Sequence, residues 1–103
     1  MLPLGSILYL KDGSQKLMII SRGVVATDTS NQPIRYDYIA CKYPLGLDVN
    51  QLIYFNQENV DKVLYKGYED EDEERFKELY QKWEEGEASK IPKGRVEKKA
   101  NEN

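Results

Sequence analysis

Short apolar runs separated by turn residues dominate the first 68 residues of the chain. The first two runs, residues 6–10 and 16–20, flank a five-residue connection that contains Asp12-Gly13. An Asp-Gly pair favours a β-hairpin because glycine accepts the positive φ that the turn requires. Both runs are apolar at odd and even positions, so we expect both faces of this hairpin to be covered.

The same pattern predicts further strands. Residues 28–33 are expected to form a surface loop because Asp, Asn and Pro favour turn conformations. The other predicted elements are a continuation of the second strand past a bulge or bend at 21–23, strands at 34–43, 52–55 and 60–66, and a helical turn at 56–59 capped by Asn56.

Alternation in the third strand predicts which of its faces is buried. Residues 37, 39, 41 and 43 share one face, which is the more aliphatic one and is expected to point inward. Cys41 would then be a small buried side chain, and Tyr36 and Tyr38 would be partly exposed. Tyrosines offer a large contact area at little entropic cost, so Tyr36 and Tyr38 are candidates for a partner surface, with a purely structural role as the alternative.

Residues 70–85 have the pattern of an amphipathic helix. Asp70 and Glu73 fit a capping box, and Gly86 is expected to end the helix. We expect its apolar stripe either to pack on the protein's own sheet or to bind a partner, and the sequence does not decide between the two. The stripe residues, which join the two tyrosines as candidate partner-binding residues, are Phe76, Leu79, Tyr80 and Trp83.

These elements predict an α+β fold. We expect a small, strongly bent antiparallel sheet, or an SH3-like barrel, of about five strands followed by one C-terminal amphipathic helix. A single domain would span residues 1–87, with a strand-rich body at 4–68 and an acidic helix at 70–85. Residues 88–103 hold five basic and two acidic side chains and few apolar ones, so we expect a flexible, disordered basic tail.

The composition excludes several kinds of chemistry. The 103 residues include no histidine and one cysteine, so the usual general base is missing and a disulfide or multi-thiolate metal site cannot form within the chain. We therefore expect no enzyme activity, no cofactor and no metal. No apolar run is long enough to cross a bilayer and no signal-peptide pattern is present, so we expect a cytoplasmic protein without membrane insertion.

Several motifs resemble a small family of unknown function from Gram-positive bacteria. Members of that family are commonly encoded beside type VII secretion genes and LXG toxins, so the resemblance implies an accessory role there and no known catalytic residues. The similarity extends over about residues 2–83. The motifs that carry it are LPLGS at 2–6, LKDG at 10–13, KLMIISRG at 16–23, YDYIAC at 36–41, YPLG at 43–46, YFN at 54–56 and VLYKGY at 63–68.

The resemblance and the lack of catalytic groups favour a protein-binding role. The first hypothesis is an adaptor or chaperone-like protein that binds a toxin or another secretion-locus protein. The second is an immunity or regulatory protein whose segment 69–87, with ten acidic and three basic side chains, neutralises a toxin. A third is nucleic-acid binding by the barrel tyrosines and the basic tail, although the near-neutral body argues against it. Homodimerisation through an exposed strand edge is left open.

Overall fold

The computed structural model describes residues 1–96, which form one antiparallel sheet followed by a helix. The α+β class expected from the sequence is confirmed, and the sheet is not closed into a barrel. All regular elements except η2, which was not predicted, agree with the predicted ones to within two residues at each end. They are β1 (Ile7–Leu10), β2 (Leu17–Thr27), β3 (Pro33–Lys42), β4 (Ile53–Phe55), η1 (Gln57–Asn59), β5 (Val60–Tyr65), α1 (Glu71–Glu85) and η2 (Glu87–Lys90).

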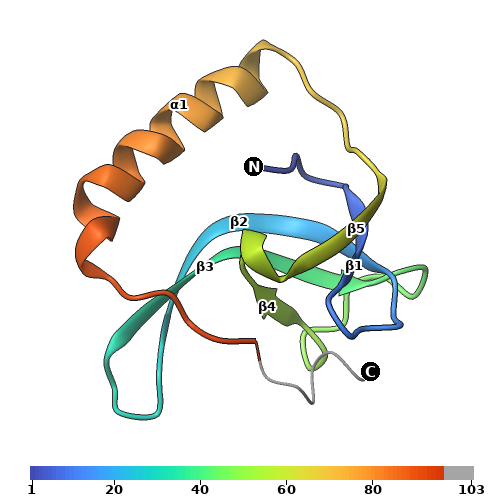
Figure 1. The fold of residues 1–103 in the computed structure, drawn as a ribbon, viewed down its shortest axis with the longest axis horizontal. Helices are drawn as coiled ribbons and strands as arrows, with labels where there is room; N and C mark the ends of the chain where they lie inside the picture. The colour runs from blue at the N-terminus through green and yellow to red at the C-terminus, as the bar shows by residue number, and fades with distance from the viewer. Residues whose placement is uncertain (97–103) are drawn as a thin grey trace.

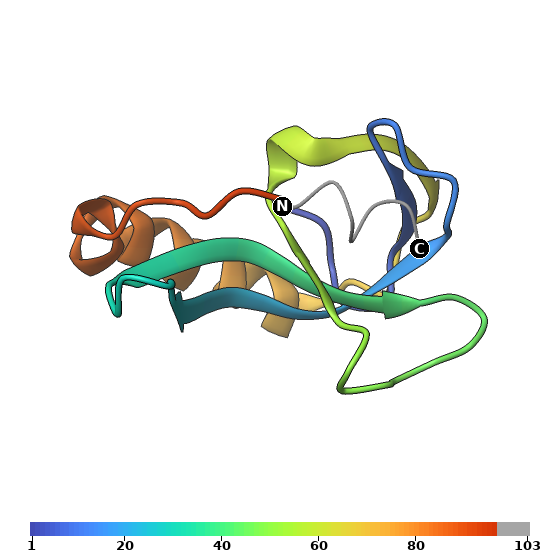
Figure 2. The same cartoon turned by 90° about the horizontal axis from the view of Figure 1, so that it is seen from below.

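The strands lie in the order β4-β3-β2-β1-β5. The long β2–β3 hairpin runs across the molecule, with α1 beside one end and β1 and β5 at the other (Figures 1 and 2). A register shift between Ile19 and Ser21 gives β2 a bulge just before the predicted position. A bulge bends a strand, which lets one hairpin serve both halves of the fold.

The hydrophobic core is formed by side chains of four strands, β1 to β4. Tyr38 belongs to this core, so the expectation that it is partly exposed is wrong. Its ring packs against Phe55 with centroids 5.1 Å apart, and its hydroxyl accepts a hydrogen bond from the Leu2 N–H at 2.8 Å. Tyrosine can be buried there because its polar end has a partner. The core side chains are Leu8, Leu10, Leu17, Ile19, Tyr38, Ala40, Ile53 and Phe55.

The apolar stripe of α1 packs on the protein's own sheet. Gly23 in β2 has φ +67°, and a Cβ there would lie only 2.8 Å from Cε2 of Tyr80 and 3.8 Å from Cζ3 of Trp83. A glycine at this position therefore permits both the backbone turn and the close approach of the helix. Leu79, another member of the stripe, is 59% exposed.

The chain after α1 begins as an ordered segment. Residues 88–96 were expected to be flexible, and this expectation is wrong: Ala88 is fully buried, and Val96 packs against the core. Main-chain hydrogen bonds to β3 help to hold this segment in place, and composition does not reveal such bonds. Residues 97–103, the rest of the predicted tail, lie outside the described part of the chain.

Candidate functional site

Asp37, in the middle of β3, is a fully buried carboxylate that joins four parts of the chain. Its Oδ1 accepts a hydrogen bond from the Tyr80 hydroxyl of α1 at 2.9 Å. Its Oδ2 accepts one from the Gln57 N–H of η1 at 2.9 Å and one from Nζ of Lys93 at 3.0 Å. A buried polar group requires partners of this kind. Asp37 therefore fixes α1, η1 and the C-terminal segment on the sheet.

The surroundings of Asp37 keep it ionised. Burial by itself raises the pKa of this carboxyl, but hydrogen bonds from Gln57, Lys93 and Tyr80 outweigh burial and lower it. Burial and the hydrogen bond to Asp37 raise the pKa of the Tyr80 hydroxyl well above its ordinary range. Burial opposes the charge of Lys93, yet its contact with Asp37 raises its pKa. A carboxylate with a lowered pKa and three donors has the properties of a structural anchor.

A second buried polar contact fixes the start of α1. Arg22 of β2 pairs with Glu73 through two hydrogen bonds, Nη1–Oε2 at 2.5 Å and Nη2–Oε1 at 2.8 Å. The guanidinium lies 3.9 Å from the centroid of the Phe76 ring, a cation–π contact. Asp70 accepts the Glu73 N–H as the capping box predicts, but the Glu73 side chain bonds Arg22 instead of the helix start.

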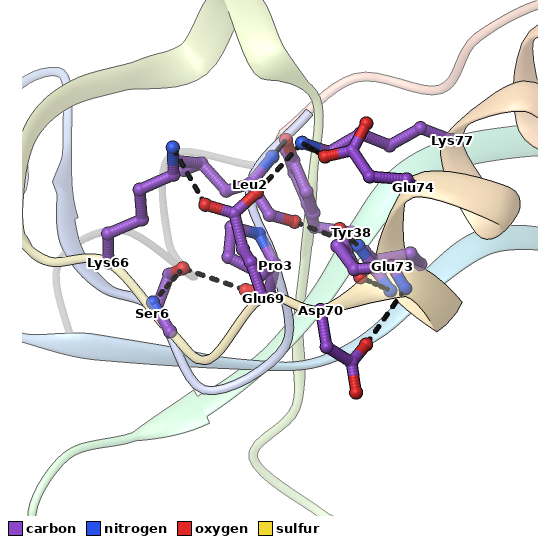
Figure 3. A network of polar contacts seen from close by, with 12 residues as sticks. Leu2, Pro3, Ser6, Tyr38, Lys66, Glu69, Asp70, Glu73, Glu74 and Lys77 are labelled. Carbon is purple, nitrogen blue, oxygen red and sulfur yellow. Dashed lines mark hydrogen bonds and ion pairs between the residues drawn. The ribbon is translucent and has the colours of Figure 1, made fainter.

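Figure 3 shows the polar contacts that hold the segment between β5 and α1. The Glu69 carboxylate lies 2.8 Å from Nζ of Lys77 and 2.9 Å from Nζ of Lys66. The hydrogen bonds from Lys77 and Lys66 lower the pKa of Glu69 to about 2. The Ser6 hydroxyl donates to the Pro3 carbonyl at 2.7 Å nearby. The Gly67 N–H donates to the Ser6 hydroxyl at 3.0 Å, so the segment is tied to α1 through Glu69 and to the N-terminal residues through Ser6.

The six predicted partner-binding residues do not form one exposed surface. Tyr38 and Tyr80 are buried, so an exposed Tyr36/Tyr38 patch does not exist. Tyr36 is half-buried, with its ring 5.4 Å from that of Tyr54. Of the helix stripe, Phe76 and Trp83 are half-buried and Leu79 is the exposed member.

A different set of exposed apolar side chains lies on β5 and just after it. Val63, Leu64 and Tyr65 are 42%, 39% and 59% exposed, and Tyr68 is 78% exposed. All residues of β5 from 61 to 65 are exposed, so the strand is uncovered on both faces. It is the last strand in the sheet order, and its outer edge has no neighbouring strand among residues 1–96. We name Val63, Leu64, Tyr65 and Tyr68 the β5 surface.

Sequence reasoning missed the β5 surface because the pattern at 60–66 predicts a strand but not its place at the edge of the sheet. The signal that was available is the pattern of Lys62 and Lys66 around residues 63–65, since lysine is common on edge strands. A second exposed apolar set lies at the other end of the sheet order, in the β3–β4 loop. Leu45, Leu47 and Val49 border a shallow hollow of about 640 Å³ there.

The described residues offer no preformed metal site. Within residues 1–96, no three His, Cys, Asp or Glu side chains are placed to share an ion. Cys41 is buried, as predicted. In the same part of the chain, no helix is long and apolar enough to span a membrane.

The sheet and the first turns of α1 identify the family. The family model described as Domain of unknown function (DUF4176) matches residues 1–76, which is most of the chain, so the chain belongs to this family. Tyr80 and Lys93, two of the donors to Asp37, lie beyond the matched residues. Neither a curated protein nor a solved structure matches the chain.

Proposed function

We propose that this member of the DUF4176 family is a non-catalytic protein-binding accessory protein, with an adaptor or chaperone-like role. The observation that carries the proposal is the β5 surface, an edge strand with apolar side chains exposed on both faces. An extended partner segment that pairs with β5 would form hydrogen bonds with the main-chain groups of its outer edge. The same segment would cover these side chains. Exposed apolar side chains of this kind are typical of interaction sites.

The resemblance described above supplies the partner class. Proteins of this kind are commonly encoded beside type VII secretion genes and LXG toxins, so the proposed partner is a toxin or another component of such a locus. Binding would take place in the cytoplasm before export. The proposal requires no cofactor and no metal.

The experiment is co-purification of the tagged full chain from a host that expresses its neighbouring genes. The test variant Val63→Lys/Tyr65→Lys places two positive charges on the β5 surface and changes no side chain of the hydrophobic core. The matched control is Leu79→Ser, which removes an exposed apolar side chain from α1. We expect the wild type and the control to recover a stoichiometric locus-encoded protein and the β5 variant to lose it. Equal recovery by all three would refute the role of β5.

The second candidate is an immunity or regulatory protein that neutralises a toxin with its acidic helix. Glu71, Asp72 and Glu74 in the first turn of α1 are exposed, whereas Glu73 is buried against Arg22. Charge reversal at the three exposed positions therefore tests this candidate without breaking the ion pair. Loss of toxin neutralisation would favour it over the β5 proposal. Nucleic-acid binding, the third hypothesis, predicts an affinity that falls steeply with salt.

A further inference from the structure

The C-terminal segment continues the sheet along an edge that β4 leaves open. β4 pairs only with residues 38–40 of β3, so it does not cover the edge of the preceding half of β3. Residues 91–96, which we name the strap, lie along it. The Arg35 N–H donates to the Pro92 carbonyl at 2.9 Å, and the Gly94 N–H donates to the Arg35 carbonyl at 2.8 Å. The strap thus forms a short parallel bridge with β3, whereas the strands of the sheet pair antiparallel.

The side chains around this edge select the residues that occupy it. Lys93 places its amino group 3.0 Å from the buried Asp37 carboxylate. The Asn56 amide donates to the Gly94 carbonyl at 2.9 Å. A Cβ at Gly94 would lie 2.2 Å from Cζ of Tyr36, so a side chain at this step fits only if the Tyr36 ring moves. The edge therefore accepts an extended backbone with a cation followed directly by a glycine.

The groove and its occupant belong to different parts of the chain. Arg35, Asp37 and Asn56, which form the groove, lie within the residues that match the family, and the strap lies beyond them. In this chain the strap, which crosses from the end of α1 toward β4 (Figure 1), fills the groove in cis.

We infer that the outer edge of β3 is a docking groove for an extended partner segment carrying a lysine followed by a glycine, and that the strap occupies it as a competing internal ligand. A tethered segment has an effective concentration in the millimolar range. The strap therefore excludes weak ligands and admits a segment that binds more tightly than it does. This groove is separate from the β5 surface, so the inference stands or falls independently of the proposed function.

The test uses the full chain and a peptide of the strap sequence, acetyl-IPKGRV-amide, as the probe. Gly94→Val prevents the strap from seating because of the contact with Tyr36. The peptide is titrated into ¹⁵N-labelled protein while the amide signals of Arg35 and Gln57 are followed. We expect Gly94→Val to be half-saturated at a peptide concentration at least tenfold below that needed for the wild type. A control peptide with Glu in place of its Lys should bind at least tenfold more weakly, since it meets Asp37.

A second variant keeps the test decisive if Gly94→Val does not fold. Lys93→Glu weakens the strap by charge repulsion with Asp37 and adds no bulk at Gly94. It too should bind the peptide more tightly than the wild type. The inference is overturned if a folded variant shows no shift at Arg35 with millimolar peptide, or if the Lys and Glu peptides bind equally. It is also overturned if size-exclusion chromatography shows a strap-exchanged dimer, because the occupant would then be a second copy.

Discussion

Replacing Asp37 with alanine removes the acceptor shared by Tyr80, Gln57 and Lys93. A hydrogen bond to a charged group contributes about 1.5–3 kcal/mol, and breaking a buried ion pair costs about 3–5 kcal/mol. Lys93 is partly exposed and regains water, which reduces its share. We therefore expect Asp37→Ala to lower the free energy of unfolding by about 3–5 kcal/mol, a large part of the ~5–15 kcal/mol typical of a domain.

Urea unfolding measures this loss, with fluorescence of Trp83, the one tryptophan in the chain, and helical circular dichroism as two probes. Asp61→Ala is the matched control, because Asp61 is an exposed aspartate on β5. It should change the free energy of unfolding by less than about 0.5 kcal/mol. A loss below about 1 kcal/mol for Asp37→Ala would refute the anchoring role of the carboxylate.

The contacts of Asp37 also predict how the stability difference between wild type and Asp37→Ala depends on pH. The pKa of Asp37 is lower in the folded protein than its unfolded value of 3.8, so its contribution is present above that value and is lost as pH falls through the folded pKa. The pKa values of Tyr80 and Lys93 are raised in the folded protein, so their contributions are lost as pH rises above about 10. The stability difference between wild type and Asp37→Ala should be constant from about pH 5 to 8 and shrink at both extremes. A difference that peaks at acidic pH would contradict this account.

Three further changes have defined outcomes. Gly23→Val should lower the free energy of unfolding by at least about 2 kcal/mol in urea, because valine is strained at φ +67° and meets Tyr80; unchanged stability would contradict the helix packing. Tyr38→Phe should cost about 1 kcal/mol in the same assay, since it loses the bond from Leu2 but keeps the ring, and a cost as large as that of Tyr38→Ala would show that the hydroxyl matters more than the packing. The Glu69 carboxyl should titrate by NMR with a pKa of about 2, and a value near 4.5 would show that the two lysine contacts do not form in solution.

Local sequence patterns predicted the elements because each rests on neighbouring residues. The hairpin at Asp12-Gly13 and the Asp70 cap are short-range features, and the structure has both, although the positive φ of 62° lies at Asp12 and not at Gly13. Tyr38 was assigned to the wrong face because β3 is covered on both sides in its middle, where alternation no longer separates inside from outside. A hydroxyl that finds a partner in the Leu2 N–H cannot be seen in a strand pattern.

The contacts that join distant segments could not be predicted from the sequence. Asp37 accepts hydrogen bonds from Gln57, Tyr80 and Lys93, which follow it in the chain by 20, 43 and 56 positions. No local rule brings these residues together. The strap is polar and reads as a flexible tail, yet its main chain pairs with β3. The β5 surface was missed because a short apolar strand does not show whether it lies at the edge of the sheet.

Hydrogen–deuterium exchange on the complex recovered by co-purification tests whether β5 is the binding surface. The account predicts slower amide exchange over residues 60–65 when the partner is present, because an added strand or a covering surface protects the edge. The exposed first turn of α1 should exchange at the same rate with and without the partner. Protection confined to α1, with β5 unchanged, would contradict the account and favour recognition through the acidic helix.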